Sequence, residues 1–239
     1  MKFVYGKQDL RDITRAQETT FLLTNGLGGY ASVTAAYSVP RCDQGLLVAA
    51  VKAPNERITM VHRMKETLRV GGREAVLSSQ EFADKTPMEE GYRCLDTFVY
   101  DYLPCWTYQV AGIRVERKLC MEHGHNTAAL LYTIENMTGE ACEILLEPFF
   151  KMAPKEKAIE EEKSLVYANG AVSADGYTVY LHTNGKVSAA EPVWQTLAYP
   201  EDAKDGRPDN GMAGSCCLVT ATAAPHEVTR LELVFSMEK

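Results

Sequence analysis

One stretch decides the fold class: Ala111-Gly112-Ile113-Arg114-Val115-Glu116-Arg117-Lys118-Leu119-Cys120-Met121. From position 113 to position 121 the odd positions are apolar, with Arg117 as the one exception, and positions 114, 116 and 118 are charged. Successive side chains of a strand point to opposite faces, so this pattern predicts a β-strand with one buried and one exposed face.

Tight-turn dipeptides extend this prediction along the chain. Asn-Gly and Asp-Gly tolerate the positive φ angles that two-residue hairpins require. Near the chain end, positions 231, 233 and 235 are apolar, whereas positions 230 and 232 are charged. Regularly spaced strands predict a mostly β protein, a large antiparallel sandwich with few short helices. The turn dipeptides are Gly71-Gly72, Ala111-Gly112, Asn169-Gly170, Asp175-Gly176 and Asn184-Gly185.

Other segments complete the prediction. Residues 127–134 and 144–150 are apolar on both parities, which indicates central strands covered on both faces. Residues 7–17 could hold a short helix, and the charged residues 155–163 could form one or two helical turns or a solvated loop. Residues 199–214 are rich in Pro, Gly and Asp, which predicts a long loop within the domain.

Composition limits the function classes. The chain has 239 residues, 46% of them apolar, and a formal net charge of −7. An acidic balance argues against a nucleic-acid partner, because phosphate recognition requires a basic surface. No run of 18 apolar residues is present and residues 1–12 lack the apolar core of a secretory signal, so we expect no membrane span. The length fits one domain, and we expect residues 1–239 to form a single β-sandwich.

Cysteine and histidine spacing bears on location and metal binding. The seven cysteines are odd in number and contain no Cys-x-x-Cys pair, which favours reduced thiols in a cytoplasmic protein. His123 and His125 would face the same side of an extended segment and, with a third ligand, could bind a metal. The other histidines are scattered, so we favour a turn that uses Asn126, and we expect no metal and no cofactor.

A glycine-rich segment, Thr24-Asn25-Gly26-Leu27-Gly28-Gly29-Tyr30, is the first candidate binding site. A dinucleotide-binding loop would require a helix after the glycines, but residues 31–38 are strand-like. Three glycines in four positions instead allow the backbone to pack very closely against another strand or a sugar ring. Asn25, Gly28 and Gly29 are therefore candidate substrate contacts.

A polar tetrad and a group of aromatic residues are the second and third candidates. Arg41-Cys42-Asp43-Gln44 precedes a buried strand-like run, and its side chains could bind sugar hydroxyls or satisfy one another at the strand end. Trp106 and Tyr108 could stack on sugar rings or fill the core. We name Arg41, Asp43, Gln44, Trp106 and Tyr108 as candidate contacts.

No segment nominates a catalytic residue. The sequence contains no Gly-x-Ser-x-Gly elbow, no P-loop and no His-Glu-x-x-His motif. Carboxylates are plentiful, but no particular pair stands out as the acid and base of a glycosidase.

Several of these stretches, in this order, resemble the N-terminal domain of bacterial and archaeal glycogen debranching enzymes. Residues 21–32 resemble the family's W-L-L-T-N-G-L-G-G-Y-A-S, and residues 116–127 resemble its E-K-x-x-x-M-x-x-G-x-N-T. Residues 96–108 are similar to its aromatic, Pro-containing hairpin. Residues 41–49 resemble R-R-Y-H-G-L-L-V-A, with Cys42-Asp43-Gln44 in place of R-Y-H. In the late loop, Y-x-x-E-x-x-R-G, Asp205 replaces the arginine.

The resemblance implies a β-supersandwich akin to mutarotase-like folds, followed by an (α/α)6 barrel. In that family the barrel carries the acid and base of the amylo-α-1,6-glucosidase. This chain ends at Lys239 without such a barrel. We therefore expect an N-terminal domain that is inactive alone, packs on the catalytic barrel of the same enzyme and helps to position an α-glucan such as glycogen or a maltooligosaccharide.

Two other functions stay open. A free-standing epimerase or mutarotase of the same fold class needs a histidine and a carboxylate that converge on a sugar, and His123 or His125 with Glu122 are the compact candidates. A purely structural interaction module needs an exposed apolar face for its partner. Sugar binding is the property that distinguishes these functions.

Overall fold

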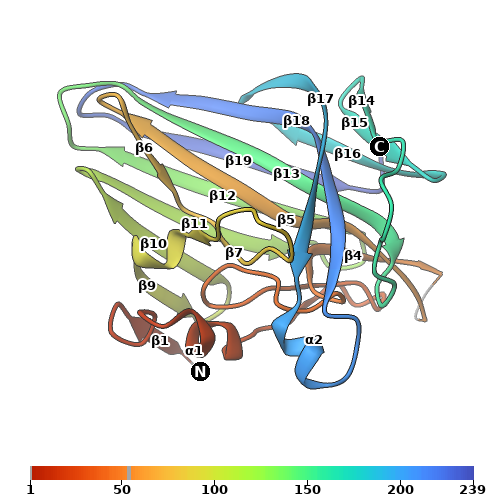
Figure 1. Cartoon of the computed structure of the whole chain (residues 1–239). Helices are drawn as coiled ribbons and strands as arrows, with labels where there is room; N and C mark the ends of the chain where they lie inside the picture. Colours follow the sequence, from red (N-terminus) through yellow and green to blue (C-terminus); the bar gives the residue numbers. More distant parts are fainter. Residues whose placement is uncertain (1, 53–54) are drawn as a thin grey trace.

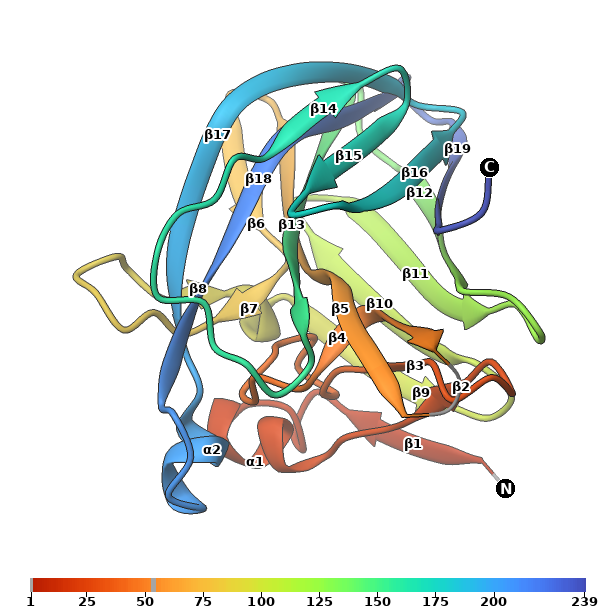
Figure 2. The same cartoon turned by 90° about the vertical axis from the view of Figure 1, so that its right-hand side faces the viewer.

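The computed structural model describes residues 2–52 and 55–239. Two antiparallel β-sheets dominate these residues and lie face to face in two layers (Figures 1 and 2). Two short α-helices and one 3₁₀ turn are the helical elements of the described part of the chain. The prediction of a mostly β, antiparallel sandwich with few short helices is confirmed.

The first layer is a nine-stranded sheet with the order β1-β9-β10-β11-β12-β19-β16-β15-β14. All of its neighbouring strands are antiparallel. The strands are β1 (Phe3–Gly6), β9 (Leu95–Tyr100), β10 (Pro104–Val110), β11 (Ile113–Met121), β12 (Thr127–Asn136), β14 (Val166–Ala168), β15 (Ala171–Ala174), β16 (Tyr177–Thr183) and β19 (Val228–Ser236).

The second layer is an eight-stranded sheet with the order β17-β18-β13-β5-β4-β3-β2, in which β6 also pairs with β5. Its strands are β2 (Leu23–Thr24), β3 (Tyr30–Ser32), β4 (Gly45–Lys52), β5 (Glu56–Val70), β6 (Arg73–Val76), β13 (Cys142–Pro154), β17 (Lys186–Ala198) and β18 (Asn210–Ala223). A separate two-stranded sheet pairs β7 (Ser79–Gln80) with β8 (Glu89–Glu90), and a 3₁₀ turn follows at Gly91–Arg93.

Four of the five turn dipeptides form the predicted two-residue hairpins. Both residues of each have positive φ, which matches the twist of the paired strands. Gly71-Gly72 joins β5 to β6, Ala111-Gly112 joins β10 to β11, Asn169-Gly170 joins β14 to β15, and Asp175-Gly176 joins β15 to β16.

Asn184-Gly185 does not form a hairpin, and the prediction is wrong at this dipeptide. It carries the chain from β16 in the nine-stranded sheet to β17 in the eight-stranded sheet. A Cβ atom on Gly185 would lie 2.7 Å from Leu231 Cδ1 and 2.8 Å from Val219 Cγ1, one side chain from each sheet. The glycine is therefore required by close packing where the chain crosses between layers.

The alternating patterns correctly predicted two strands and the face that each strand buries. β11 begins at Ile113 and ends at Met121, and in β19 the three apolar side chains are buried while positions 230 and 232 are exposed. β12 and β13 are central strands, as predicted. They are not covered on both faces along their whole length, however, because Leu131 is 36% exposed and the residues at 143, 145 and 147 are only half-buried.

The helical segments are shorter than the sequence suggests. Helix α1 (Ile13–Glu18) occupies the end of the predicted 7–17 segment, and the Asp12 carboxylate accepts a hydrogen bond from Thr14 N at 3.0 Å as its N-cap. Residues 155–163 form an irregular loop. Residues 199–214 are not one long loop, because they contain helix α2 (Pro200–Lys204) and the start of β18. Among the described residues, no helix has the length and apolarity needed to cross a membrane.

The core between the sheets contains a buried ion pair. Arg117, the exception in the β11 pattern, is fully buried and bonds to Glu66 of β5 in the opposite sheet. The arginine donates to the Tyr108 hydroxyl at 2.7 Å, and the Tyr132 hydroxyl donates to Glu66 at 2.6 Å. One polar cluster therefore links the two layers through the centre of an apolar core.

Candidate functional site

The glycine-rich segment packs against the turn that contains the two histidines. It forms the β2–β3 connection, and Asn25 is completely buried there. The Asn25 side-chain amide donates to His125 O at 2.9 Å and to Asn126 Oδ1 at 3.0 Å, and its Oδ1 accepts from Leu27 N at 3.0 Å. Asn126 in turn bonds to both backbone groups of Ala50 in β4. The Asn25 side chain is thus occupied by the protein itself.

At these glycines the backbone packs closely against other groups of the protein. A Cβ atom on Gly29 would lie 2.7 Å from Asn25 Nδ2 and 3.0 Å from Val48 O. A Cβ atom on Gly26 would lie 2.5 Å from the His123 ring, and a strand rather than a helix follows the segment. Gly28 has a φ of +100° and is half-buried. Of the three candidate contacts in this segment, Gly28 is the one that is not enclosed.

Gly29→Ala is expected to lower the free energy of unfolding by about 1–3 kcal/mol, because the methyl group would displace the Asn25–Asn126 bond or the β4 backbone. Chemical denaturation measures the change. Gly139→Ala is the matched control, since no heavy atom lies within 4 Å of a Cβ atom at that turn position, and its effect is expected within about 0.5 kcal/mol. Equal effects of the two substitutions would contradict the close-packing role of Gly29.

The polar tetrad meets the late loop at one end of the molecule. Asp202 of α2 is fully buried and accepts from Cys42 N at 2.7 Å and from Arg41 Nη1 at 3.2 Å. Arg41 Nη1 also donates to Asp205 Oδ2 at 2.5 Å. Arg207 Nη1 lies 3.3 Å from Asp43 Oδ2 and 3.5 Å from Asp202 Oδ1. Two segments about 160 positions apart in sequence thus form one charged cluster.

The charges in this cluster are paired. The hydrogen bond that Arg41 donates to Asp205 raises the pKa of Arg41 above its ordinary value, and the same bond lowers the pKa of Asp205. The acid at position 205, where the debranching-enzyme pattern has an arginine, is therefore balanced by Arg41. Arg41, Asp43 and Arg207 stay partly exposed, with 29%, 24% and 40% of their side chains accessible.

Buried side chains pack against the polar tetrad 41–44 on its inner side. His62 of β5 bonds through Nδ1 to the Gln44 carbonyl and through Nε2 to the Tyr199 hydroxyl, both at 2.9 Å. Burial, reinforced by the nearby Lys151, lowers the pKa of His62 to about 3, so this histidine is neutral. Gln44 is 4% exposed, and its side-chain Oε1 finds no hydrogen-bond partner among the described residues.

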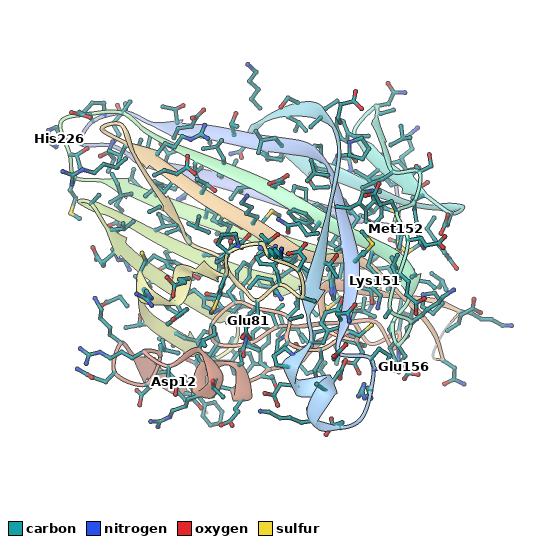
Figure 3. All side chains as sticks on the ribbon, in the orientation of Figure 1. Asp12, Glu81, Lys151, Met152, Glu156 and His226 are labelled. Atoms are coloured by element: carbon teal, nitrogen blue, oxygen red, sulfur yellow. The ribbon has the colours of Figure 1, made fainter. Side chains whose placement is uncertain are left out.

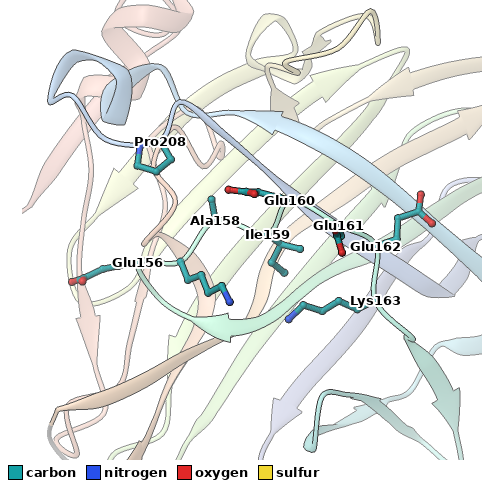
Figure 4. A pocket seen from close by; sticks show the side chains of 9 residues that line it. Glu156, Ala158, Ile159, Glu160, Glu161, Glu162, Lys163 and Pro208 are labelled. Carbon is teal, nitrogen blue, oxygen red and sulfur yellow. The ribbon is translucent and has the colours of Figure 1, made fainter.

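Two adjoining hollows lie beside the charged cluster. The larger, of about 550 Å³, is lined by residues 156–163 and Pro208. Figure 4 shows Pro208 facing this segment. The smaller, of about 280 Å³, shares Glu156 and Pro208 with it and is lined further by Cys42, Asp202 and Arg207. Partly exposed carboxylate and guanidinium groups beside these hollows can exchange hydrogen bonds with the hydroxyls of a polar ligand.

The two aromatic candidates lie elsewhere. Trp106 and Tyr108 are completely buried in β10, where Trp106 Nε1 donates to Ala35 O at 3.0 Å and the Tyr108 hydroxyl accepts from Arg117. Neither ring has a free face for a sugar, so the core-packing alternative holds for both. The structure does not bring them to the charged cluster.

The histidines proposed for an epimerase do not converge on a hollow. His125 Nδ1 pairs with Glu238 at the surface, and this bond raises the pKa of His125. His123 lies against Gly26. Within the described part of the chain, no three histidine, cysteine or carboxylate side chains are grouped for a metal ion.

Sequence reasoning missed two members of the site. Arg207 lies in a charged segment that had the appearance of a solvated loop. Lys151 lies in a strand recognised by its apolar residues. The signal that could have found the cluster is the late-loop resemblance, because its Y-x-x-E-x-x-R-G pattern falls on residues 199–206, which include Tyr199, Asp202 and Asp205.

Known proteins resemble this chain in sequence and in fold. The family model described as glycogen debranching enzyme N terminal matches residues 20–229. No curated protein matches the chain. Among solved structures, a protein titled as a kojibiose phosphorylase from the human microbiome has a TM-score of 0.46 and 9% identity over 98% of this chain. A bacterial glucoamylase in complex with acarbose has a TM-score of 0.46 and 10% identity over 93% of this chain. The match covers 32% of each of these two structures, so the chain spans about a third of their length.

Proposed function

Because this chain belongs to the glycogen debranching enzyme N-terminal family, we propose that it is a non-catalytic domain of a glycosidase that acts on α-glucans. In this proposal residues 1–239 form one β-sandwich domain, and a separate catalytic barrel of the same enzyme supplies the acid and base for amylo-α-1,6-glucosidase activity. All seven cysteines are free thiols, which supports a cytoplasmic location.

The observation that carries the proposal is the charged cluster around Asp202. It joins the two loops that resemble family segments, and it lies beside two hollows. We propose that Arg41, Asp43 and Arg207 contact glucan hydroxyls and that Gly28 contributes at most a backbone contact. Gln44, Asn25 and Gly29 act as supports, since they are buried.

The role of this surface is to position the glucan. Groups that orient a substrate lower the barrier of a reaction without supplying a catalytic atom, because the bound geometry is already close to the reactive one. Partly exposed charged groups suit this task, since charged hydrogen bonds are stronger than neutral ones.

Titration with maltooligosaccharides and with isomaltose, followed by NMR or calorimetry, tests this function. Asp43→Ala and Arg207→Ala are each expected to weaken binding about fivefold to tenfold, which corresponds to the loss of one charged hydrogen bond. Glu227→Ala is the control, because it neighbours His226 at the end of the molecule opposite Glu156 (Figure 3). Reducing-sugar release from a branched dextrin is expected to be absent.

Three outcomes would contradict the proposal. Absence of binding up to several millimolar glucan would remove the substrate-contact role. An equal loss of binding in the Glu227→Ala control would place the site elsewhere. Hydrolysis by the purified chain, with contaminating enzyme excluded, would overturn its non-catalytic assignment.

A further inference from the structure

A buried lysine lies in direct contact with a cysteine sulfur. Lys151 of β13 is 1% exposed, and its Nζ lies 3.0 Å from Cys42 Sγ. The same ammonium donates to Cys42 O and to Lys155 O, each at 2.8 Å. Lysine is almost never buried this deeply without a carboxylate partner. The three acceptors of this one are two backbone carbonyls and a sulfur atom.

The backbone holds both groups in place. Met152 has a φ of +45°, and the register between β13 and β5 shifts at this point, so the strand is irregular beside Lys151. Figure 3 shows Lys151 and Met152 at the end of the molecule where Glu156 also lies. On the other side, the bond from Cys42 N to Asp202 fixes the cysteine backbone. The amine and the sulfur are therefore oriented toward each other before any reaction.

Cys42 also borders a hollow that is large enough for small solutes. Cys42 is one of the residues that line the smaller hollow, together with Asp202 and Arg207. Its low overall exposure of 3% excludes large reagents, but a molecule the size of hydrogen peroxide needs little more space than a water molecule.

We propose that Cys42 and Lys151 form an oxidation-sensitive pair that closes to a covalent sulfur–nitrogen bond with hydrogen peroxide. In the first step the Cys42 thiolate attacks one peroxide oxygen, the O–O bond breaks, and the hydroxide that leaves takes a proton from the Lys151 ammonium to become water. In the second step the free Lys151 amine attacks the sulfenic sulfur, and the sulfenic oxygen leaves as a second water. One thiol, one amine and one peroxide thus give one sulfenamide and two waters.

The 3.0 Å contact allows the two groups to share one proton. Burial lowers the pKa of Lys151, which favours the free amine that the second step needs. Burial raises the pKa of Cys42, and the nearby Lys151 ammonium opposes this rise by stabilising the thiolate that the first step needs. With the proton on nitrogen the sulfur is the nucleophile, and with the proton lost to hydroxide the nitrogen is the nucleophile.

The consequence is a covalent tie between the loop 41–44 and β13. Arg41 and Asp43, which flank the reacting sulfur, would be held in one position relative to the sheet. This inference does not rest on glucan binding, because its test reads out a bond within the protein.

Peptide mapping after treatment with one equivalent of hydrogen peroxide tests the pair. After capture of the remaining thiols by alkylation, trypsin is expected to release residues 42–52 joined to residues 119–155, since Lys151 is then blocked. The joined species is expected to be about 2 Da lighter than its two parts and to separate on reduction with a thiol. With two equivalents of peroxide, a joined species about 16 Da heavier than this would also support the pair, because a second peroxide is consumed and an oxygen atom is kept between nitrogen and sulfur.

Two variants keep the test sharp. Cys42→Ser and Lys151→Arg are each expected to abolish the joined species, and the arginine variant retains a cation that can donate to the same acceptors. Cys142, a buried cysteine of β13, the strand that contains Lys151, serves as the internal control and is expected to stay reduced. Accumulation of unlinked Cys42 sulfinic acid, or an unreacted Cys42 when the half-buried Cys94, Cys105 and Cys120 are oxidised, would overturn the proposal.

Discussion

Arg117→Leu is expected to lower the free energy of unfolding by about 3–5 kcal/mol, because it leaves the Glu66 carboxylate buried without its partner. Glu66 lies at zero exposure between the sheets, and burial, opposed by the attraction of Arg117, raises its pKa. Tyr132 would be the remaining hydrogen-bond donor to this carboxylate. Denaturation in urea, monitored by tryptophan fluorescence, measures the loss directly, since Trp106 lies against the Arg117 guanidinium.

A double-mutant cycle separates the pair from its surroundings. Glu66→Leu combined with Arg117→Leu is expected to recover a large part of the loss, because two apolar side chains of suitable volume leave no buried charge. Arg114→Ala is the control on the same strand, since its partners Glu116 and Glu135 are both partly exposed; its cost is expected below about 1 kcal/mol. A loss below about 1 kcal/mol for Arg117→Leu would show that the core tolerates the free carboxylate.

Acidification from pH 7.5 to pH 5 is expected to remove about 2 kcal/mol of stability through His62 alone. Its folded-state pKa of about 3 lies below the ordinary value of 6.5. Between these two values the unfolded chain binds a proton that the folded chain does not bind. The free energy of unfolding therefore decreases as the pH falls below 6.5. The stability that neutral His62 contributes is fully present only above that pH.

His62→Gln tests this origin of the acid sensitivity. The variant is expected to lose stability at pH 7.5, where it disturbs the bonds to Gln44 and Tyr199, but its decrease from pH 7.5 to pH 5 is expected to be smaller than that of the wild type by about 2 kcal/mol. His182→Gln, at an exposed position of β16, is the control and is expected to keep the wild-type pH dependence. An unchanged pH dependence in His62→Gln would show that other groups cause the acid sensitivity.

Local patterns predicted the strands because each depends on neighbouring residues only. The alternation at 113–121 gave β11 its bounds, and four turn dipeptides gave their hairpins, since positive φ is a property of the two residues themselves. The hairpin predicted at Asn184-Gly185 was wrong because the conformation of this dipeptide depends on which sheet the next strand joins. The prediction that β12 is covered on both faces was wrong as well, because an apolar residue such as Leu131 does not by itself show whether another element covers it.

The candidate site was less predictable because its contacts are long-range. Arg41 and Asp205 meet across 164 positions, and no local pattern encodes that contact. The tetrad at 41–44 was found through its polar character at a strand end. Arg207 and Lys151 were missed, since an arginine in a charged loop and a lysine in an apolar strand have no distinguishing spacing. The charge on the core face of β11 was visible as an exception, but its partner Glu66 was not.

The place of β19 in the nine-stranded sheet has a consequence for synthesis in the cell. This strand is formed by residues 228–236, yet it lies between β12 and β16 in the interior of the sheet. Until the ribosome releases these residues, β12 and β16 each present an unpaired edge, and such edges are sites of aggregation. The nine-stranded layer is therefore completed only after residues 228–236 have left the ribosome, and a nascent chain halted before residue 228 leaves both edges open to aggregation.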